Sequence, residues 1–89
     1  MTNQDFLNKV RELVSNYTNE HTDPSDNAIL VYPDDVYLVW SCKTLQNNKA
    51  LASTPRFDGM YYEVTYNGDK NEIYFDAYKK FENRKIVIR

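Results

Sequence analysis

Cysteine, histidine and glycine are scarce in this chain, and the low number of each excludes a kind of structural or binding site. One cysteine, Cys42, cannot form an internal disulfide, and together with the one histidine, His21, it cannot close a zinc site. The two glycines, Gly59 and Gly68, stand apart, so no glycine-rich loop is present that could cradle phosphates. We therefore expect no metal ion and no cofactor.

Long apolar runs are also absent, which excludes a membrane-spanning helix. The first residues lack the basic-then-apolar pattern of a secretory signal, and the lone cysteine fits a reducing compartment. We therefore expect no membrane association and a place in the cytoplasm. A length of 89 residues leaves room for one domain, residues 1–89.

The residues give no catalytic arrangement. A cysteine nucleophile needs a base, usually histidine, to form its thiolate, and His21 lies far from Cys42 in the sequence. We interpret Cys42 as a small core residue on a strand and expect that the protein is not an enzyme.

An amphipathic helix is predicted over residues 4–20. Asn3 or Thr2 can cap it, with Asp5 in the first turn. One apolar stripe at helical spacing predicts that the helix packs on a sheet. The stripe consists of Phe6, Val10, Leu13, Val14 and Tyr17.

Short runs of β-branched and aromatic residues, separated by turn-forming residues, predict strands after the helix. They cover residues 28–32, 36–45, 50–54, 60–66, 71–81 and 85–88. Whether the first joins the main sheet is left open. The fold class predicted is α+β: an antiparallel meander of four to six strands with the N-terminal helix packed on one face.

Strict alternation along residues 36–45 places the even positions, including Trp40 and Cys42, toward the core. Residues 46–49 (QNNK) are interpreted as a hairpin turn, because asparagine tolerates left-handed backbone. This turn pairs Leu45 with Ala50 and Thr44 with Leu51.

Asn67-Gly68 predicts a second hairpin. A two-residue loop would set Glu63 against Glu72, so we prefer a four-residue loop, 67–70, which sets Glu63 beside Tyr74. Either register gives the same two faces. The core face carries Met60, Tyr62, Val64, Tyr66, Ile73, Phe75, Ala77 and Phe81; the other carries Tyr61, Glu63, Thr65, Glu72, Tyr74, Asp76, Tyr78 and Lys80.

Three tyrosines thus share the face away from the core with carboxylates. Carboxylates repel the phosphates that a single-strand binder must attract, whereas tyrosine mixed with acids suits a protein partner. An alternative is that the rings only cover the sheet, where tyrosine has good propensity. The predicted partner-binding residues are Tyr61, Glu63, Tyr74, Asp76 and Tyr78, with Asp34 and Asp35 from the acidic segment 20–35.

Residues 79–89 contain five basic side chains and one acid, Glu82. This basic end supports an alternative role in nucleic-acid binding. The residues concerned are Lys79, Lys80, Arg84, Lys85 and Arg89. A further alternative is a self-associating structural subunit, a homodimer joined through an exposed strand edge.

The strings KTLQN, DGMYYEVTYNGDKNE and YKKFEN are unusual, and they lie within a stretch that resembles a known family. Over roughly residues 4–83 the chain is similar to small uncharacterised proteins encoded by phages and prophages of Gram-positive bacteria. The resemblance carries no catalytic residues. It implies an accessory protein in the cytoplasm of the host cell. There it would bind a host protein and inhibit or modulate it, as an anti-defence or anti-CRISPR-like inhibitor does.

Overall fold

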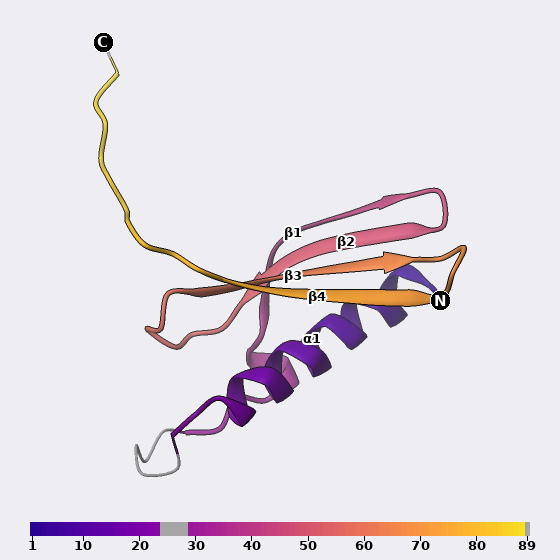
Figure 1. Ribbon diagram of the computed structural model, residues 1–89, viewed down its shortest axis with the longest axis horizontal. Helices are drawn as coiled ribbons and strands as arrows, with labels where there is room; N and C mark the ends of the chain where they lie inside the picture. The colour runs from indigo at the N-terminus through magenta and orange to yellow at the C-terminus, as the bar shows by residue number, and fades with distance from the viewer. Residues whose placement is uncertain (24–28, 89) are drawn as a thin grey trace.

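The computed structural model describes residues 1–23 and 29–88 and shows a helix packed across a four-stranded antiparallel sheet (Figure 1). Helix α1 spans Asn3–Glu20, and a short 3-10 turn, η2 (Pro33–Asp35), precedes the first strand. The strands follow in chain order across the sheet: β1 (Tyr37–Thr44), β2 (Asn47–Ser53), β3 (Met60–Asn67) and β4 (Glu72–Lys79). The predicted α+β meander is confirmed.

Helix α1 begins with a capping box. The Thr2 hydroxyl accepts the Asp5 backbone N–H at 3.0 Å, and the Asp5 carboxylate accepts the Thr2 backbone N–H at 3.1 Å. Hydrogen bonds from the Thr2 backbone and side chain lower the pKa of Asp5, because they favour its charged form. The helix therefore starts where the sequence predicts.

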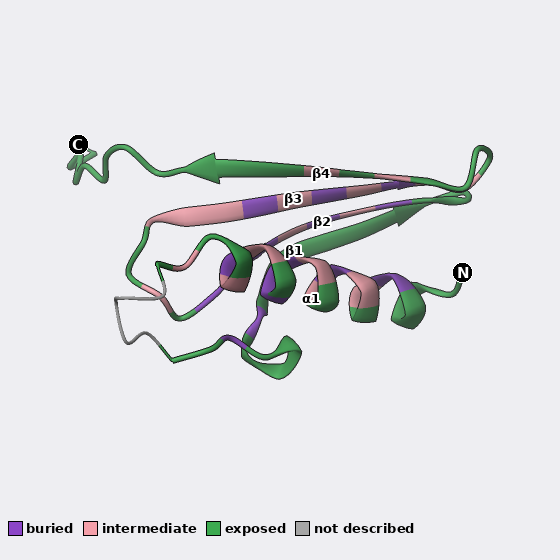
Figure 2. Ribbon diagram, turned by 60° about the horizontal axis from the view of Figure 1, so that its bottom comes forward, coloured by how far each residue is buried: buried purple, intermediate pink, exposed green. Residues whose placement is uncertain are grey.

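The core lies between α1 and the two central strands, and Figure 2 shows buried residues along both. Phe6, Val10 and Val14 are fully buried on the helix. The small side chains of Ala50 and Ala52 on β2 let the helix approach the sheet closely. The predicted division of β3 and β4 into two faces is confirmed: Tyr62, Val64 and Tyr66 are buried, and Ile73 and Phe75 pack against the core. Ala77, which was predicted in the core, lies opposite Tyr62 on the same side of the sheet but is exposed.

A β-bulge at Val39 overturns the prediction that Trp40 and Cys42 point inward. Leu38 pairs with Ala52, but Trp40 pairs with Leu51, so Val39 is an extra residue in β1. The bulge reverses the alternation, because side chains directly opposite each other share a face. Trp40 and Cys42 are exposed on the side of the sheet away from α1.

The first hairpin turns earlier than predicted. Thr44 pairs with Asn47, so the turn consists of Leu45 and Gln46, and the predicted pairing of Leu45 with Ala50 is wrong. Leu45 itself adopts the left-handed backbone, with φ of 56°. The Asn47 side chain instead accepts the Gly68 N–H at 3.0 Å, and it thereby ties this turn to the second hairpin.

The second hairpin has a four-residue loop, but its register differs by two residues from the preferred one. Asn67 pairs with Glu72, which places Glu63 opposite Asp76 and not beside Tyr74. The Asn67 side chain accepts hydrogen bonds from the backbone N–H groups of Asp69 and Lys70 within the loop. Asn71 ends the loop in left-handed backbone, with φ of 53°. A shift by two residues preserves the two faces.

Two predicted strands are not strands in the structure. Residues 29–32 have no regular structure, and residue 28 lies outside the described part. The Asn19 side chain bonds both backbone groups of Val31, at 2.7 and 2.9 Å, and so replaces a partner strand. Residues 80–88 are also irregular, because β4 ends at Lys79, and Phe81 is exposed and not in the core.

Candidate functional site

No helix or strand among the described residues covers the side of the sheet opposite α1, which we call the outer face (Figure 2). Opposed pairs across the four strands place aromatic, apolar and charged side chains together there. The large and charged side chains of the outer face are Tyr37, Trp40, Lys49, Leu51, Tyr61, Glu63, Glu72, Tyr74, Asp76 and Tyr78, and Cys42 and Thr65 lie among them. All of them are exposed or half-buried.

The aromatic part of the outer face crosses three strands at one end of the sheet. Tyr61 on β3 lies directly opposite Tyr78 on β4, and Tyr37 lies opposite Ser53. A shallow hollow of ≈ 240 Å³ opens here between Tyr37, Tyr61 and Lys80. An aromatic rim around a hollow gives a partner side chain a place to insert.

The central part of the outer face is acidic. Glu63 lies opposite Asp76, and the Lys49 Nζ group lies 3.2 Å from Glu63 Oε1, so one cation offsets two facing carboxylates. The Tyr74 hydroxyl donates a 2.8 Å hydrogen bond to Glu72, and this bond raises the pKa of Tyr74. In the described part of the chain, Asp76 has no hydrogen-bonding or ion-pairing partner.

The structure brings five of the seven predicted partner-binding residues together on the outer face: Tyr61, Glu63, Tyr74, Asp76 and Tyr78. Asp34 and Asp35 are not among them. They lie on η2, which packs against α1, and the Asp35 carboxylate accepts the Tyr32 backbone N–H at 2.8 Å. Asp35 thus closes the local turn, and Asp34 is exposed beside it, so their role in partner binding stays a prediction.

Sequence reasoning missed Trp40 and Leu51. Both sit on the outer face because of the bulge at Val39, and Leu51 lies between Trp40 on β1 and Glu63 on β3. Periodicity in the sequence does not reveal an extra residue in a strand. Strict alternation counted from Val36 therefore predicted that Trp40 points toward the core. Its exposed fraction is 42%.

The basic residues predicted for nucleic-acid binding do not form one patch. Lys79 lies opposite Met60 and lines a cleft on the helix side, whereas Lys80 borders the outer-face hollow. Arg84 and Lys85 lie on the exposed segment after β4, where Arg84 Nε contacts Glu82 Oε1 at 2.6 Å. Arg89 falls outside the described residues.

Cys42 and His21 are not brought together. Cys42 is exposed on the outer face, near the first hairpin turn. His21 caps α1 on the helix side, where its ring stacks on Tyr17 with centroids 3.9 Å apart. Within residues 1–23 and 29–88, no three His, Cys, Asp or Glu side chains gather as a metal site.

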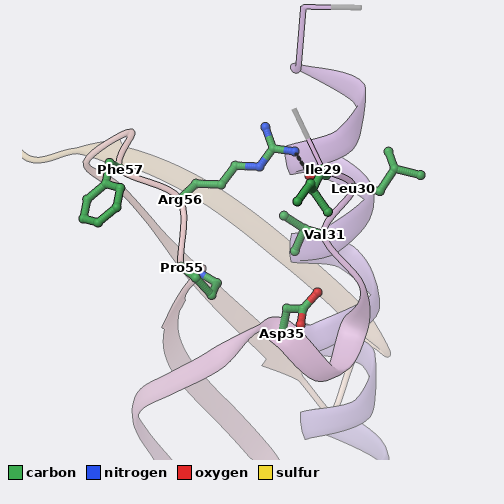
Figure 3. Close-up of a pocket in the computed structure, with 7 residues that line it drawn as sticks. All are labelled: Ile29, Leu30, Val31, Asp35, Pro55, Arg56 and Phe57. Carbon is green, nitrogen blue, oxygen red and sulfur yellow. Dashed lines mark hydrogen bonds between the residues drawn. The ribbon is translucent and has the colours of Figure 1, made fainter. Parts of the chain in front are cut away.

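A second hollow, of ≈ 440 Å³, lies between the segment before η2 and the loop after β2 (Figure 3). Arg56 bridges it: its guanidinium donates to the Ile29 carbonyl at 2.6 Å and to the Thr22 hydroxyl at 2.8 Å. The lining is mostly apolar and includes Leu30, Pro55 and Phe57. We interpret this hollow as a surface groove between two segments that the Arg56 guanidinium joins.

Comparison with known proteins identifies a family and no individual relative. The model of a family of unknown function (DUF6275) matches residues 7–88. No curated protein matches the chain, and no solved structure matches it. None of the helices in the described residues has the length and apolar character needed to span a membrane.

Proposed function

The chain belongs to the family of unknown function DUF6275, and we propose that it is a non-enzymatic binding protein whose outer face docks on another protein. The observation that carries this proposal is the open outer face itself. It combines a half-buried Leu51 and an exposed Trp40 with the paired rings of Tyr61 and Tyr78. Large aromatic side chains at the centre of a surface are typical of protein interfaces.

The charges of the outer face favour a basic protein surface over nucleic acid as the partner. Glu63, Glu72 and Asp76 outnumber Lys49, so the field over the rings repels phosphate and attracts lysine and arginine. Lys80 and Arg56 add positive charge at the hollow, and the Arg56 guanidinium already donates to the Thr22 hydroxyl and the Ile29 carbonyl. The partner should therefore present apolar side chains surrounded by basic ones.

Within this proposal the partner is a host protein that the chain inhibits or modulates, in line with the phage-encoded proteins that the sequence resembles. A basic groove built for nucleic acid has the complementary charge. An acidic face with exposed rings would occupy such a groove and exclude its natural ligand. In this form the protein is an anti-defence inhibitor that acts by blocking a site, and it needs no chemistry of its own.

A capture experiment followed by titration tests the proposal. The tagged protein is incubated with lysate of a Gram-positive bacterium, the captured protein is purified, and its Kd is measured by calorimetry. We expect Trp40→Ala and Tyr61→Ala each to raise the Kd by about 30-fold, because they remove large aromatic contacts from the outer face. The matched control is Tyr32→Ala, an exposed tyrosine before η2 on the helix side, which should leave the Kd unchanged.

Two outcomes would contradict the proposal. One is equal binding by the wild type, the outer-face variants and Tyr32→Ala, which would place the contact elsewhere. The other is tight binding of the isolated protein to single-stranded or duplex nucleic acid with a steep dependence on salt. That second result would favour the basic residues Lys79, Lys80, Arg84 and Lys85, and substitution of Arg84 and Lys85 by glutamine should then abolish it.

A further inference from the structure

The chain continues beyond β4 as residues 80–88, which we call the arm and which pair with no strand of the described chain. Figure 1 shows it running away from the sheet. Its last backbone bond to the sheet joins the Lys80 N–H to the Gly59 carbonyl at 2.7 Å. Farther along, Phe81 is 97% exposed and Ile88 86% exposed. A β-branched run, Ile86 to Ile88, has good strand propensity and is largely exposed to solvent.

Strand β4 offers the complementary feature, because one of its edges is free. It pairs with β3 along one edge in unbroken register, and no strand of the described chain pairs with the other. The opposite edge of the sheet, β1, carries the bulge at Val39, which hinders the addition of a strand. An unprotected, regular edge of eight residues is a template for pairing with another chain.

We propose that the arm of one copy pairs with β4 of a second copy, and that the second arm pairs with β4 of the first. Each arm directly continues β4, so a single antiparallel pairing centred near Lys80 makes both contacts at once. The result is a two-fold symmetric dimer, the commonest closed assembly. The dimer buries the apolar side chains of both arms, and its backbone hydrogen bonds occupy the free edge of both β4 strands.

Side chains facing each other across this pairing are complementary. With Lys80 at the centre, Arg84 of the arm lies opposite Asp76, which has no partner within its own chain as described. Ile86 lies opposite Tyr74, an exposed ring on the outer face. On the helix side, Val87 lies opposite Ile73, which α1 covers only in part. Opposite charges thus meet at Arg84 and Asp76, and apolar groups meet at Ile86 and at Val87. The same register sets Lys80 opposite Lys80 of the other copy, which opposes association at the two-fold axis.

The dimer is distinct from the contact made with another protein. Because opposed side chains share a face, both helices lie on one side of the joined sheet and both outer faces on the other. Asp76 then pairs with the arm, whereas Trp40, Leu51 and Tyr61 stay open. Variants at Trp40 and Tyr61 should therefore leave the dimer intact, so either claim can fail without the other.

Size-exclusion chromatography with light scattering, over a range of protein concentrations, measures the association. We expect a dimer for the wild type and a Kd about tenfold higher for Asp76→Arg or Arg84→Asp, since each breaks two symmetry-related pairs and opposes like charges. The double variant Asp76→Arg/Arg84→Asp exchanges the charges and should restore the wild-type Kd. Glu82→Gln, which removes only the ion pair within the arm, serves as the control.

Cross-linking tests the register independently. In a Cys42→Ser background, Tyr74→Cys with Ile86→Cys places two thiols opposite each other across the proposed interface, and mild oxidation should give a covalent dimer. Tyr74→Cys with Lys85→Cys places them on opposite faces and should give none. A monomer at all concentrations, a dimer unaffected by the charge variants, a double variant that fails to restore association, or equal cross-linking of both cysteine pairs would overturn the proposal.

Discussion

Trp40 lies directly opposite Leu51 on the outer face, although strict alternation along β1 would have turned it toward the helix. One inserted residue, Val39, produces this arrangement by reversing the phase of the strand. The helix-side positions that follow are Ser41 and Lys43, which pair with Ala50 and Asn48. Polar residues suit these positions, because α1 packs over β2 and β3 and leaves β1 exposed.

The same bulge predicts that Cys42 is chemically accessible. The thiol is exposed on the outer face, so Ellman's reagent should modify it in the native protein at a rate close to that in denaturant. The reaction is followed by absorbance at several denaturant concentrations, with Cys42→Ser as the blank. A thiol that reacts only after unfolding would show that Cys42 belongs to the core and that the bulge is misplaced.

Gly68 should tolerate no side chain, because a Cβ atom there would overlap the Gln46 carbonyl oxygen in the neighbouring turn. We expect Gly68→Ala to lower the free energy of unfolding by about 3 kcal/mol through overpacking of the two hairpin turns. The matched control is Gly59→Ala. Gly59 has φ of +70°, but the nearest atom to its added Cβ would be 3.5 Å away.

The loss for Gly59→Ala should be only about 1 kcal/mol, the cost of a side chain in left-handed backbone. Urea unfolding followed by circular dichroism gives both values. Equal losses for the two variants would mean that the turns separate readily and that their contact contributes little to stability.

Arg56 should be poorly replaced by lysine. Its planar guanidinium donates at once to the Thr22 hydroxyl and the Ile29 carbonyl, and a single ammonium group cannot span both acceptors. We expect Arg56→Lys to lower the free energy of unfolding by about 1–2 kcal/mol. Arg84→Lys, on the exposed arm, should change it by less than about 0.5 kcal/mol at concentrations where the protein is monomeric.

Tyr62 should make stability fall at alkaline pH. Burial against α1 raises the pKa of its phenol above the ordinary value near 10, so the folded state holds the proton more tightly than the unfolded state does. The stability that this provides is complete below pH 10 and is lost as pH rises through the folded pKa.

Unfolding measurements from pH 8 to pH 11 test this prediction for the wild type and Tyr62→Phe. The loss of stability above about pH 10 should be shallower for Tyr62→Phe, since the variant has no proton to release at this site. Tyr78→Phe, at an exposed position on the outer face, controls for the general loss of one tyrosine. Parallel curves for the wild type and Tyr62→Phe would contradict the assignment.

The sequence by itself determined the features that depend on short-range periodicity. A helical stripe that includes Phe6, Val10 and Val14 required a sheet to pack on, and the alternation around Tyr62 and Val64 divided β3 and β4 into a core face and an outer face. The sequence therefore predicted that Tyr61, Glu63 and Asp76 share one surface, whichever register the hairpin adopts.

The tertiary structure decided what depends on contacts between distant segments. The bulge at Val39 is compatible with this fold because α1 does not cover β1, so polar side chains can face the helix side there. The register of the second hairpin follows from side-chain hydrogen bonds within its loop and from the packing of Gly68 against Gln46. Residues 29–32 form no strand, and the Asn19 side chain bonds both backbone groups of Val31 in place of a partner strand. Backbone hydrogen bonds can be satisfied by any suitably placed partner, and local propensity cannot name that partner.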